Sequence, residues 1–208
     1  MSDGLSIAAA LLVVGPVFGA IGVANPALLR AWTAPRDEHL ATVGAHRRAW
    51  MLANAGFTLA TIATAAGLVV LVGAVDLADG PRAILAAVAA VYLIAGAQWC
   101  TVLAIRNGTT PALADMVAVG TATEPAETLL GRATAGIFAT FTLATGAALA
   151  ILGFTLALGG VIAAPVALLA MLIAVLAISG FLARGDMPPF VLYIPTLLVG
   201  LALLLGGH

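Results

Sequence analysis

Long apolar runs with almost no charged residues decide what this chain can fold into. About 20 consecutive apolar residues cross a bilayer as a helix, and several runs reach that length. Only 8% of the residues are charged and 63% are hydrophobic, whereas a soluble domain carries roughly 25% charged residues. Transmembrane β-strands need short alternating segments, which we do not find. The sequence therefore predicts an all-α polytopic membrane protein with a single membrane domain over residues 1–208.

Six apolar segments have the length and the flanking residues of membrane helices. We place them at about residues 5–30, 47–75, 81–106, 129–158, 160–184 and 189–205. The chain begins with an acidic stretch, whereas a cleaved signal peptide has a positive N-terminal region, so we expect the first segment to be retained. Gly15, Gly19 and Gly22 fall on one side of this segment, which favours close contact with another helix.

An arginine followed five residues later by a proline occurs three times, and each copy lies between two apolar segments. The copies start 76 and 78 residues apart, and they are Arg30 with Pro35, Arg106 with Pro111, and Arg184 with Pro189. With 8 arginines and 10 prolines among 208 residues, chance predicts about 0.4 such pairs. We interpret the copies as the cytoplasmic turns of three tandem helical hairpins. In each turn, arginine anchors one helix end at the lipid headgroups and proline starts the next helix.

The distribution of arginine predicts how the six segments are oriented. Seven arginines fall on the side of the three turns, and only Arg82 falls on the other side. Because basic residues collect on the cytoplasmic side of membrane proteins, we expect both termini outside the cytoplasm. The chain has no lysine and is rich in alanine, glycine and arginine, which is typical of a GC-rich bacterial genome. The predicted location is therefore the plasma (inner) membrane of a bacterium.

A second internal match supports a duplication of the hairpins. An ungapped shift of 84 residues lays Phe57–Thr61 on Phe141–Thr145 with identical residues, and it also aligns Pro81 with Pro165. This shift differs from the spacing of the arginine–proline copies, so the two agree only if the loops have unequal lengths. Helices that correspond under either shift cross the membrane in the same direction, which predicts parallel repeats related by an axis along the membrane normal.

Uncharged polar residues form stripes on several expected helices, whereas no Asp, Glu, His or Lys falls deep within any of them. Asn54, Thr58 and Thr61 share one helix face because they are spaced by four and three residues. The other stripe residues are Gln98, Thr101, Thr142, Thr145, Tyr193 and Thr196. If they converge inside a bundle, these groups line a narrow, neutral path for a solute. The alternative is that they bond only to carbonyls of their own helix or link neighbouring helices.

Signatures of enzymes and of cofactor sites are not found in the sequence. Glu38, His39 and His46 form one polar cluster, but two histidines seven residues apart on a helix are separated by about 10.5 Å along its axis. That separation is too large for shared metal ligation without a third element. Cys100 is the single cysteine, which excludes an intrachain disulfide. We expect no catalytic residue, no metal and no cofactor, and the net charge of −1 provides no basic patch for nucleic acid.

Two functions fit these features, and a third fits them less well. The first is a passive channel or facilitator for a small uncharged solute, with Asn54 and Gln98 as its leading path residues. The second is a non-catalytic scaffold or accessory subunit of a larger complex. The third is a membrane-embedded enzyme that acts through the cluster of Glu38, His39 and His46. The expected partners are the lipid bilayer, a second copy of the chain, and a membrane or cytoplasmic protein.

Overall fold

The structure is a computed structural model that describes residues 2–206, except for the side chains of residues 27, 28, 32, 36 and 37. It is 88% helix, and the described residues form no strand, which confirms the predicted all-α class. In chain order the elements are α1 (Asp3–Val23), α2 (Pro26–Thr33), α3 (Arg36–Ala45), α4 (Arg47–Ala74), α5 (Asp79–Ala118), α6 (Glu124–Leu158), α7 (Ala164–Arg184), the 3-10 helix η1 (Pro189–Tyr193) and α8 (Ile194–Leu205).

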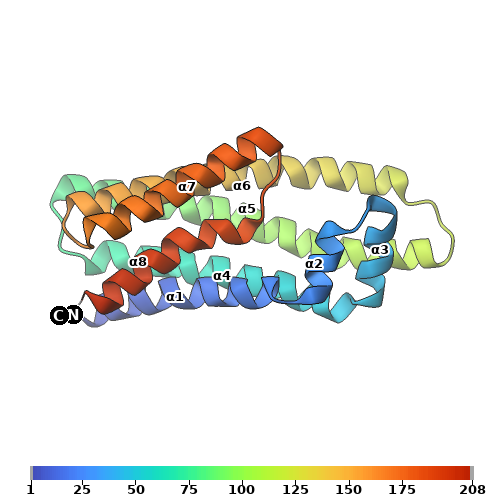
Figure 1. Ribbon diagram of the computed structural model, residues 1–208, viewed down its shortest axis with the longest axis horizontal. Helices are drawn as coiled ribbons and strands as arrows, with labels where there is room; N and C mark the ends of the chain where they lie inside the picture. The colour runs from blue at the N-terminus through green and yellow to red at the C-terminus, as the bar shows by residue number, and fades with distance from the viewer. Residues whose placement is uncertain (1, 207–208) are drawn as a thin grey trace.

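The long helices run up and down along one axis of the molecule (Figure 1). Each long helix packs against the next one in chain order, and α8 returns to pack against α1, so that these helices form a closed ring. The two termini lie together at one end, whereas α2, α3 and the turn from α5 to α6 lie toward the other. We name the latter the arginine-rich end, because Arg30, Arg47, Arg106, Arg132 and Arg184 fall in the parts of their helices nearest to it.

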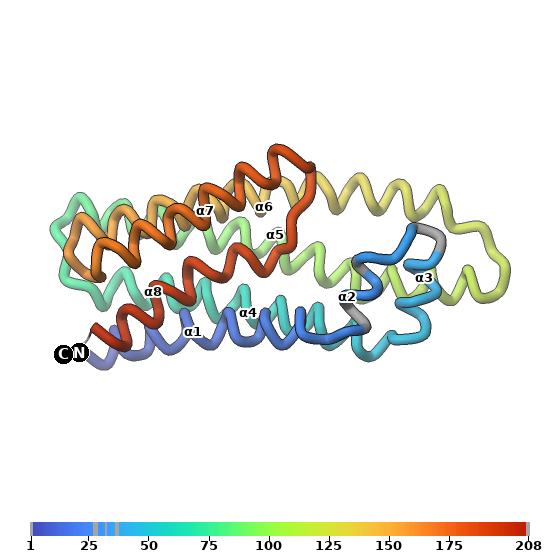
Figure 2. Tube along the Cα trace, in the orientation of Figure 1, coloured from blue at the N-terminus to red at the C-terminus, as the bar shows by residue number. Residues whose placement is uncertain are grey.

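Five of the described helices are long and apolar enough to cross a membrane, namely α1, α4, α5, α6 and α7. The sixth predicted segment, Pro189–Leu205, is a shorter apolar helix. At 1.5 Å per residue, the 40 residues of α5 extend over about 60 Å, which is twice the roughly 30 Å of a bilayer's hydrocarbon core. Figure 2 shows where the excess lies, because α5 and α6 continue past the level at which α1 and α7 end.

The structure corrects the prediction for the second arginine–proline copy. Arg106 and Pro111 both lie inside α5, which continues to Ala118 instead of ending near residue 106. A proline inside a helix costs about 3 kcal/mol through its missing N–H group and its ring. Contacts of α5 with α3 and α6 hold the helix together through this region. The other two copies do mark turns, since Pro35 caps the start of α3 and Pro189 begins η1.

The bounds of the other elements differ from the expected ones mainly at loops. The expected helix 47–75 agrees with α4 to within one residue. The expected helix 5–30 is divided into α1 and α2, because the residue before Pro26 is disfavoured in a helical conformation. The start of α7 is delayed to Ala164, after a turn in which Gly160 adopts a positive φ of 64°.

Glycines bring α1 and α4 into close contact, as the stripe of small residues predicted. A Cβ atom added to Gly15 would lie 2.5 Å from Thr64 Oγ1 and 2.9 Å from the carbonyl oxygen of Ala60. A Cβ added to Gly22 would lie 3.1 Å from the carbonyl oxygen of Ala53. In a membrane, such close approach of helix backbones supplies the van der Waals contact that drives helix association. The α1–α4 pair therefore depends on residues that have no side chain.

This packing predicts different effects for two glycine-to-alanine substitutions. Gly15→Ala forces a methyl group against the α4 backbone, and we expect it to destabilise the protein by about 1–3 kcal/mol. Gly73→Ala is the matched control, because a Cβ there meets nothing within 4 Å and alanine favours the helix. Unfolding of both variants in mild detergent, followed by circular dichroism, measures the difference. Equal stability of the two variants would contradict the packing described here.

Candidate functional site

The turn between α7 and η1 is built by its own sequence. Gly185 caps α7 in the left-handed conformation, with a φ of 73°, and its N–H group donates to the carbonyl of Phe181. Glycine is the residue that adopts this conformation without a steric cost. Asp186 then accepts a 2.8 Å hydrogen bond from the N–H group of Met187 through Oδ1. Two prolines follow, so the chain leaves α7 abruptly and reverses its direction into η1.

One face of α5 presents an aromatic ring and a cation to this turn. Trp99 and Arg106 are seven residues apart, which places them two turns apart on the same side of the helix. The Arg106 guanidinium carbon lies 5.8 Å from the centre of the Trp99 ring, within the range of a cation–π contact. Trp99 in turn stacks on Phe141, with ring centres 5.2 Å apart, and contacts Phe138 at the same distance. The tryptophan is therefore held rigidly beneath the arginine.

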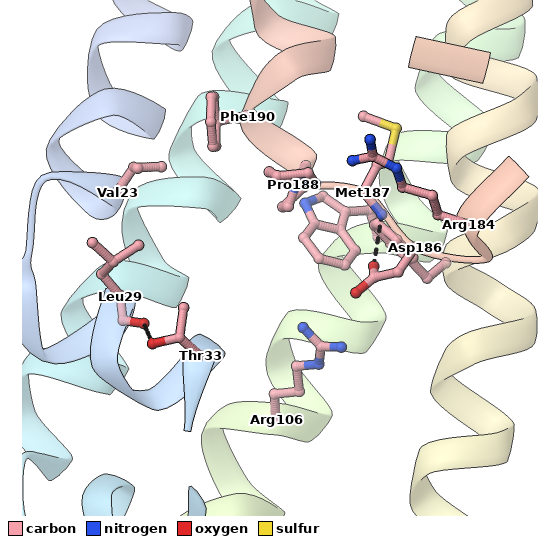
Figure 3. A pocket seen from close by; sticks show the side chains of 12 residues that line it. Val23, Leu29, Thr33, Arg106, Arg184, Asp186, Met187, Pro188 and Phe190 are labelled. Carbon is pink, nitrogen blue, oxygen red and sulfur yellow. Dashed lines mark hydrogen bonds between the residues drawn. The ribbon is translucent and has the colours of Figure 1, made fainter. Parts of the chain in front are cut away.

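A cleft of about 480 Å³ opens above this pair, between α1 and α2 on one side and α5, α6 and the α7–η1 turn on the other (Figure 3). The described residues that line it are Val23, Leu29, Thr33, Trp99, Arg106, Phe138, Arg184, Asp186, Met187, Pro188, Pro189 and Phe190. Most of these side chains are apolar. Its volume falls within the range of small-molecule sites in proteins.

Two arginines and one aspartate supply the charges of the cleft. In Figure 3 the Arg106 guanidinium and the Asp186 carboxylate point toward one another, and the two groups interact electrostatically. Within the described part of the chain, the side chains of Arg106 and Arg184 make no hydrogen bond and no salt bridge. The lining therefore carries a surplus of one positive charge and two guanidinium groups with free donors.

The arginine–proline copies meet at this cleft. Arg106 and Arg184 begin the second and third copies, and both line it. The first copy contributes Leu29 and Thr33, which flank Arg30, while Arg30 itself lines a neighbouring hollow with Glu38. The three copies thus lie at a similar height along the bundle axis, although only the first and third copies mark turns.

Most residues of the predicted polar stripes bond to their own helix. The Asn54 amide donates to the Trp50 carbonyl at 3.0 Å, and the Thr58 hydroxyl donates to the Asn54 carbonyl at 3.0 Å. Thr101 donates to Ala97 at 3.0 Å, and Thr196 donates to Tyr193 at 2.8 Å. Such bonds to the preceding turn satisfy a hydroxyl group without any solute.

One pair of stripe residues links distant segments. The Thr61 hydroxyl donates to the Phe57 carbonyl at 2.8 Å and lies 2.7 Å from the Tyr193 hydroxyl, which bridges α4 to η1. Both side chains are fully buried. Since α4 and η1 are far apart in the chain, this contact fixes where the C-terminal hairpin returns to the ring.

The remaining stripe residues fall into two separate places. Gln98 and Thr101 line a shallow groove on the outside of α5 and α6, away from the Asn54 stripe. Thr142 and Thr145 are fully buried, and their hydroxyl groups have no hydrogen-bond partner among the residues described. The structure therefore does not bring all the predicted path residues to one cavity.

The polar segment near α3 holds helices together. His39 donates from Nδ1 to the Ala31 carbonyl at 2.8 Å, and its ring meets the Trp50 ring edge-on at 5.6 Å. Arg47 bonds to the Asp115 carboxylate and donates to the Pro111 carbonyl at 3.1 Å, which ties α4 to the extension of α5. The hydrogen bond from Arg47 holds the pKa of Asp115 below its usual value. Among the side chains that the structure describes, no set of three His, Cys, Asp or Glu is placed to hold a metal ion.

Comparison with known protein families, with curated proteins and with solved structures found no match for this chain. Its class therefore follows from the helices alone. Five helices that are long and apolar enough to cross a bilayer indicate a multi-pass integral membrane protein.

Sequence reasoning did not single out the cleft, because it interpreted each arginine separately as a headgroup anchor. Two signals were nevertheless present. Trp99 lies seven residues before Arg106, which predicts that both side chains lie on the same face of a helix. The arginine–proline repeat also predicts that Arg106 and Arg184 lie at the same height along the bundle axis. The cleft itself could not be found in this way, because its lining residues come from segments that are far apart in the chain.

Proposed function

We propose that this membrane protein binds an amphipathic anion, a molecule with a phosphate or carboxylate on an apolar chain, in the cleft beside Arg106. One observation carries the proposal. The Arg106 guanidinium lies over the Trp99 ring, faces the cleft, and has no hydrogen bond or salt bridge with another described residue. A cation next to hydrocarbon is costly unless it is paired, so an anion that enters the cleft gains a strong interaction.

The geometry of arginine favours oxyanions over other ligands. A guanidinium presents a planar set of donors that matches a carboxylate or a phosphate with two parallel hydrogen bonds. Arg184, at the end of α7, also lines the cleft and adds a second such group, and Asp186 offsets only one of the two charges. The site therefore favours a ligand that carries one or two negative charges.

The apolar walls select the rest of the ligand. Trp99, Phe138 and Phe190 form a surface on which a hydrocarbon chain or an aromatic ring packs. By the asymmetry of arginine, the cleft opens toward the cytoplasmic leaflet. A lipid headgroup from that leaflet and a free amphiphile, such as a fatty acid or an alkyl phosphate, share the required chemistry.

A titration of the purified protein in nanodiscs tests this proposal. In neutral phosphatidylcholine discs, dodecyl phosphate should change the tryptophan emission in a saturable way, and Arg106→Gln should weaken its binding about tenfold or more through the loss of charge-assisted hydrogen bonds. Arg132→Gln is the control, since this exposed arginine does not line the cleft. In discs with phosphatidylglycerol, the response disappears if lipid headgroups already fill the site, and persists if the site takes free anions. Equal affinity of the wild type and Arg106→Gln would overturn the proposal.

A passive path for a small uncharged solute is the second candidate function. The observation in its favour is the pair of fully buried hydroxyls at Thr142 and Thr145, which have no partner among the described residues and could bond to a passing solute. If this path operates, proteoliposomes should re-swell faster than empty liposomes in glycerol or urea. Replacement of both threonines by valine, which keeps their shape, should abolish the acceleration. Re-swelling at the rate of empty liposomes for every solute would exclude the path.

A further inference from the structure

The turn between α7 and η1 lines two hollows of the protein surface. One is the cleft beside Arg106, and the other is a groove of about 300 Å³ along α7, which we name the α7 groove. Four residues line both hollows, namely Arg184, Asp186, Met187 and Pro188. Figure 3 shows these four side chains in the wall of the cleft. The cleft and the α7 groove therefore meet at this turn.

One face of α7 forms the wall of the α7 groove. Ile173, Ala177, Gly180 and Arg184 are spaced by four, three and four residues, which places them on the same face of the helix. The first three are apolar, and at 1.5 Å per residue the arginine follows Ile173 by about 16 Å along the axis. An added Cβ at Gly180 would meet nothing within 4 Å, so the missing side chain keeps the groove open. Val191 of η1 also lines it.

The α7 groove lies on an exposed apolar side of the bundle. Leu176, which lines the groove, is 59% exposed, and Leu172, one turn earlier, is 51% exposed. The contacts of α7 are mainly with α6, α8 and η1, so the rest of its apolar surface is uncovered by the chain. In a multi-pass membrane protein, an uncovered apolar surface contacts the acyl chains of lipids. The groove is therefore accessible to a lipid chain.

The end of the α7 groove calls for an anion as well as a chain. The Arg184 guanidinium makes no hydrogen bond and no salt bridge with another described residue. Asp186 offsets only one of the charges of Arg106 and Arg184, so one positive charge remains where the two hollows meet. A phosphate has enough acceptor oxygens to bond to two guanidinium groups, each through its planar set of donors. An anionic headgroup thus complements the turn.

We propose that the ligand of the cleft is an anionic phospholipid of the surrounding bilayer that lies across the α7–η1 turn. Its phosphate binds Arg106 and Arg184, one acyl chain occupies the cleft, and the second chain occupies the α7 groove. This inference rests on the anion site proposed above and adds the class of ligand. Two apolar hollows that meet at a cationic turn match a lipid with two chains and one anionic headgroup, whereas a single-chain amphiphile fills only one hollow.

Photo-crosslinking in nanodiscs tests where the chains lie. Phosphatidic acid and phosphatidylcholine, each with a diazirine in both acyl chains, are added to separate samples at the same low fraction, and the labelled residues are mapped by mass spectrometry. Phosphatidic acid should label residues 173–180 about tenfold more than phosphatidylcholine does, because charge-assisted hydrogen bonds hold its phosphate at the turn. At Leu59 and Ile62, on the exposed face of α4, the two lipids should label equally.

Gly180→Leu separates the two hollows, because the leucine fills the α7 groove without meeting another part of the chain. It should abolish the enrichment at residues 173–177 and leave the enrichment at Phe138 and Phe190 of the cleft, which also shows that the variant is folded. Gly136→Leu is the control, since this open glycine lines neither hollow. It should change nothing.

The outcomes distinguish this inference from the anion site on which it rests. Enrichment of phosphatidic acid in the cleft but not in the α7 groove would overturn the two-chain lipid and leave the anion site intact. Enrichment at residues 173–177 that persists in Gly180→Leu would overturn it as well. Enrichment in neither hollow would overturn the lipid ligand, and the dodecyl phosphate titration of Arg106→Gln would then decide whether the cleft binds a free anion.

Discussion

A bilayer offers no water to polar groups, and this constraint governs the whole molecule. Backbone groups satisfy it by forming helices, which account for 88% of the described residues. Side chains satisfy it by bonding to the preceding turn, as Asn54 and Thr58 do, or by bridging segments, as Thr61 does with Tyr193. Where a polar group makes no such bond, as at Arg106 in the cleft, we propose that another molecule supplies the partner.

Arg106 and Arg184 lie at a similar height along the bundle axis, and different interactions stabilise the bundle on the two sides of that height. On its apolar side, helices associate without a hydrophobic driving force, so close packing at Gly15 and Gly22 supplies the contact between α1 and α4. Beyond it, α5 and α6 continue, and charged groups hold the elements together through Arg47 and Asp115. The cleft lies at the boundary, where an apolar wall and two guanidinium groups meet.

Much of this architecture follows from sequence, because the lengths of the apolar runs and the positions of the prolines predict where membrane helices begin and end. The α4 bounds, the turn after Arg184 and the glycine contact of α1 were all predictable. The extension of α5 was not, since contacts with α3 and α6 override the proline at 111. The cleft was missed because its walls come from segments far apart in the chain. The predicted repeat and the solute path stay predictions.

From the distribution of arginine we predict that the arginine-rich end faces the cytoplasm and that the opposite end faces outward. Single cysteines at Val119 and Asp79, each combined with Cys100→Ser, place one thiol at either end of α5. An impermeant maleimide should label Asp79→Cys in intact bacterial cells, and should label Val119→Cys only after the membrane is opened. Labelling of Val119→Cys in intact cells, with Asp79→Cys protected, would contradict the account.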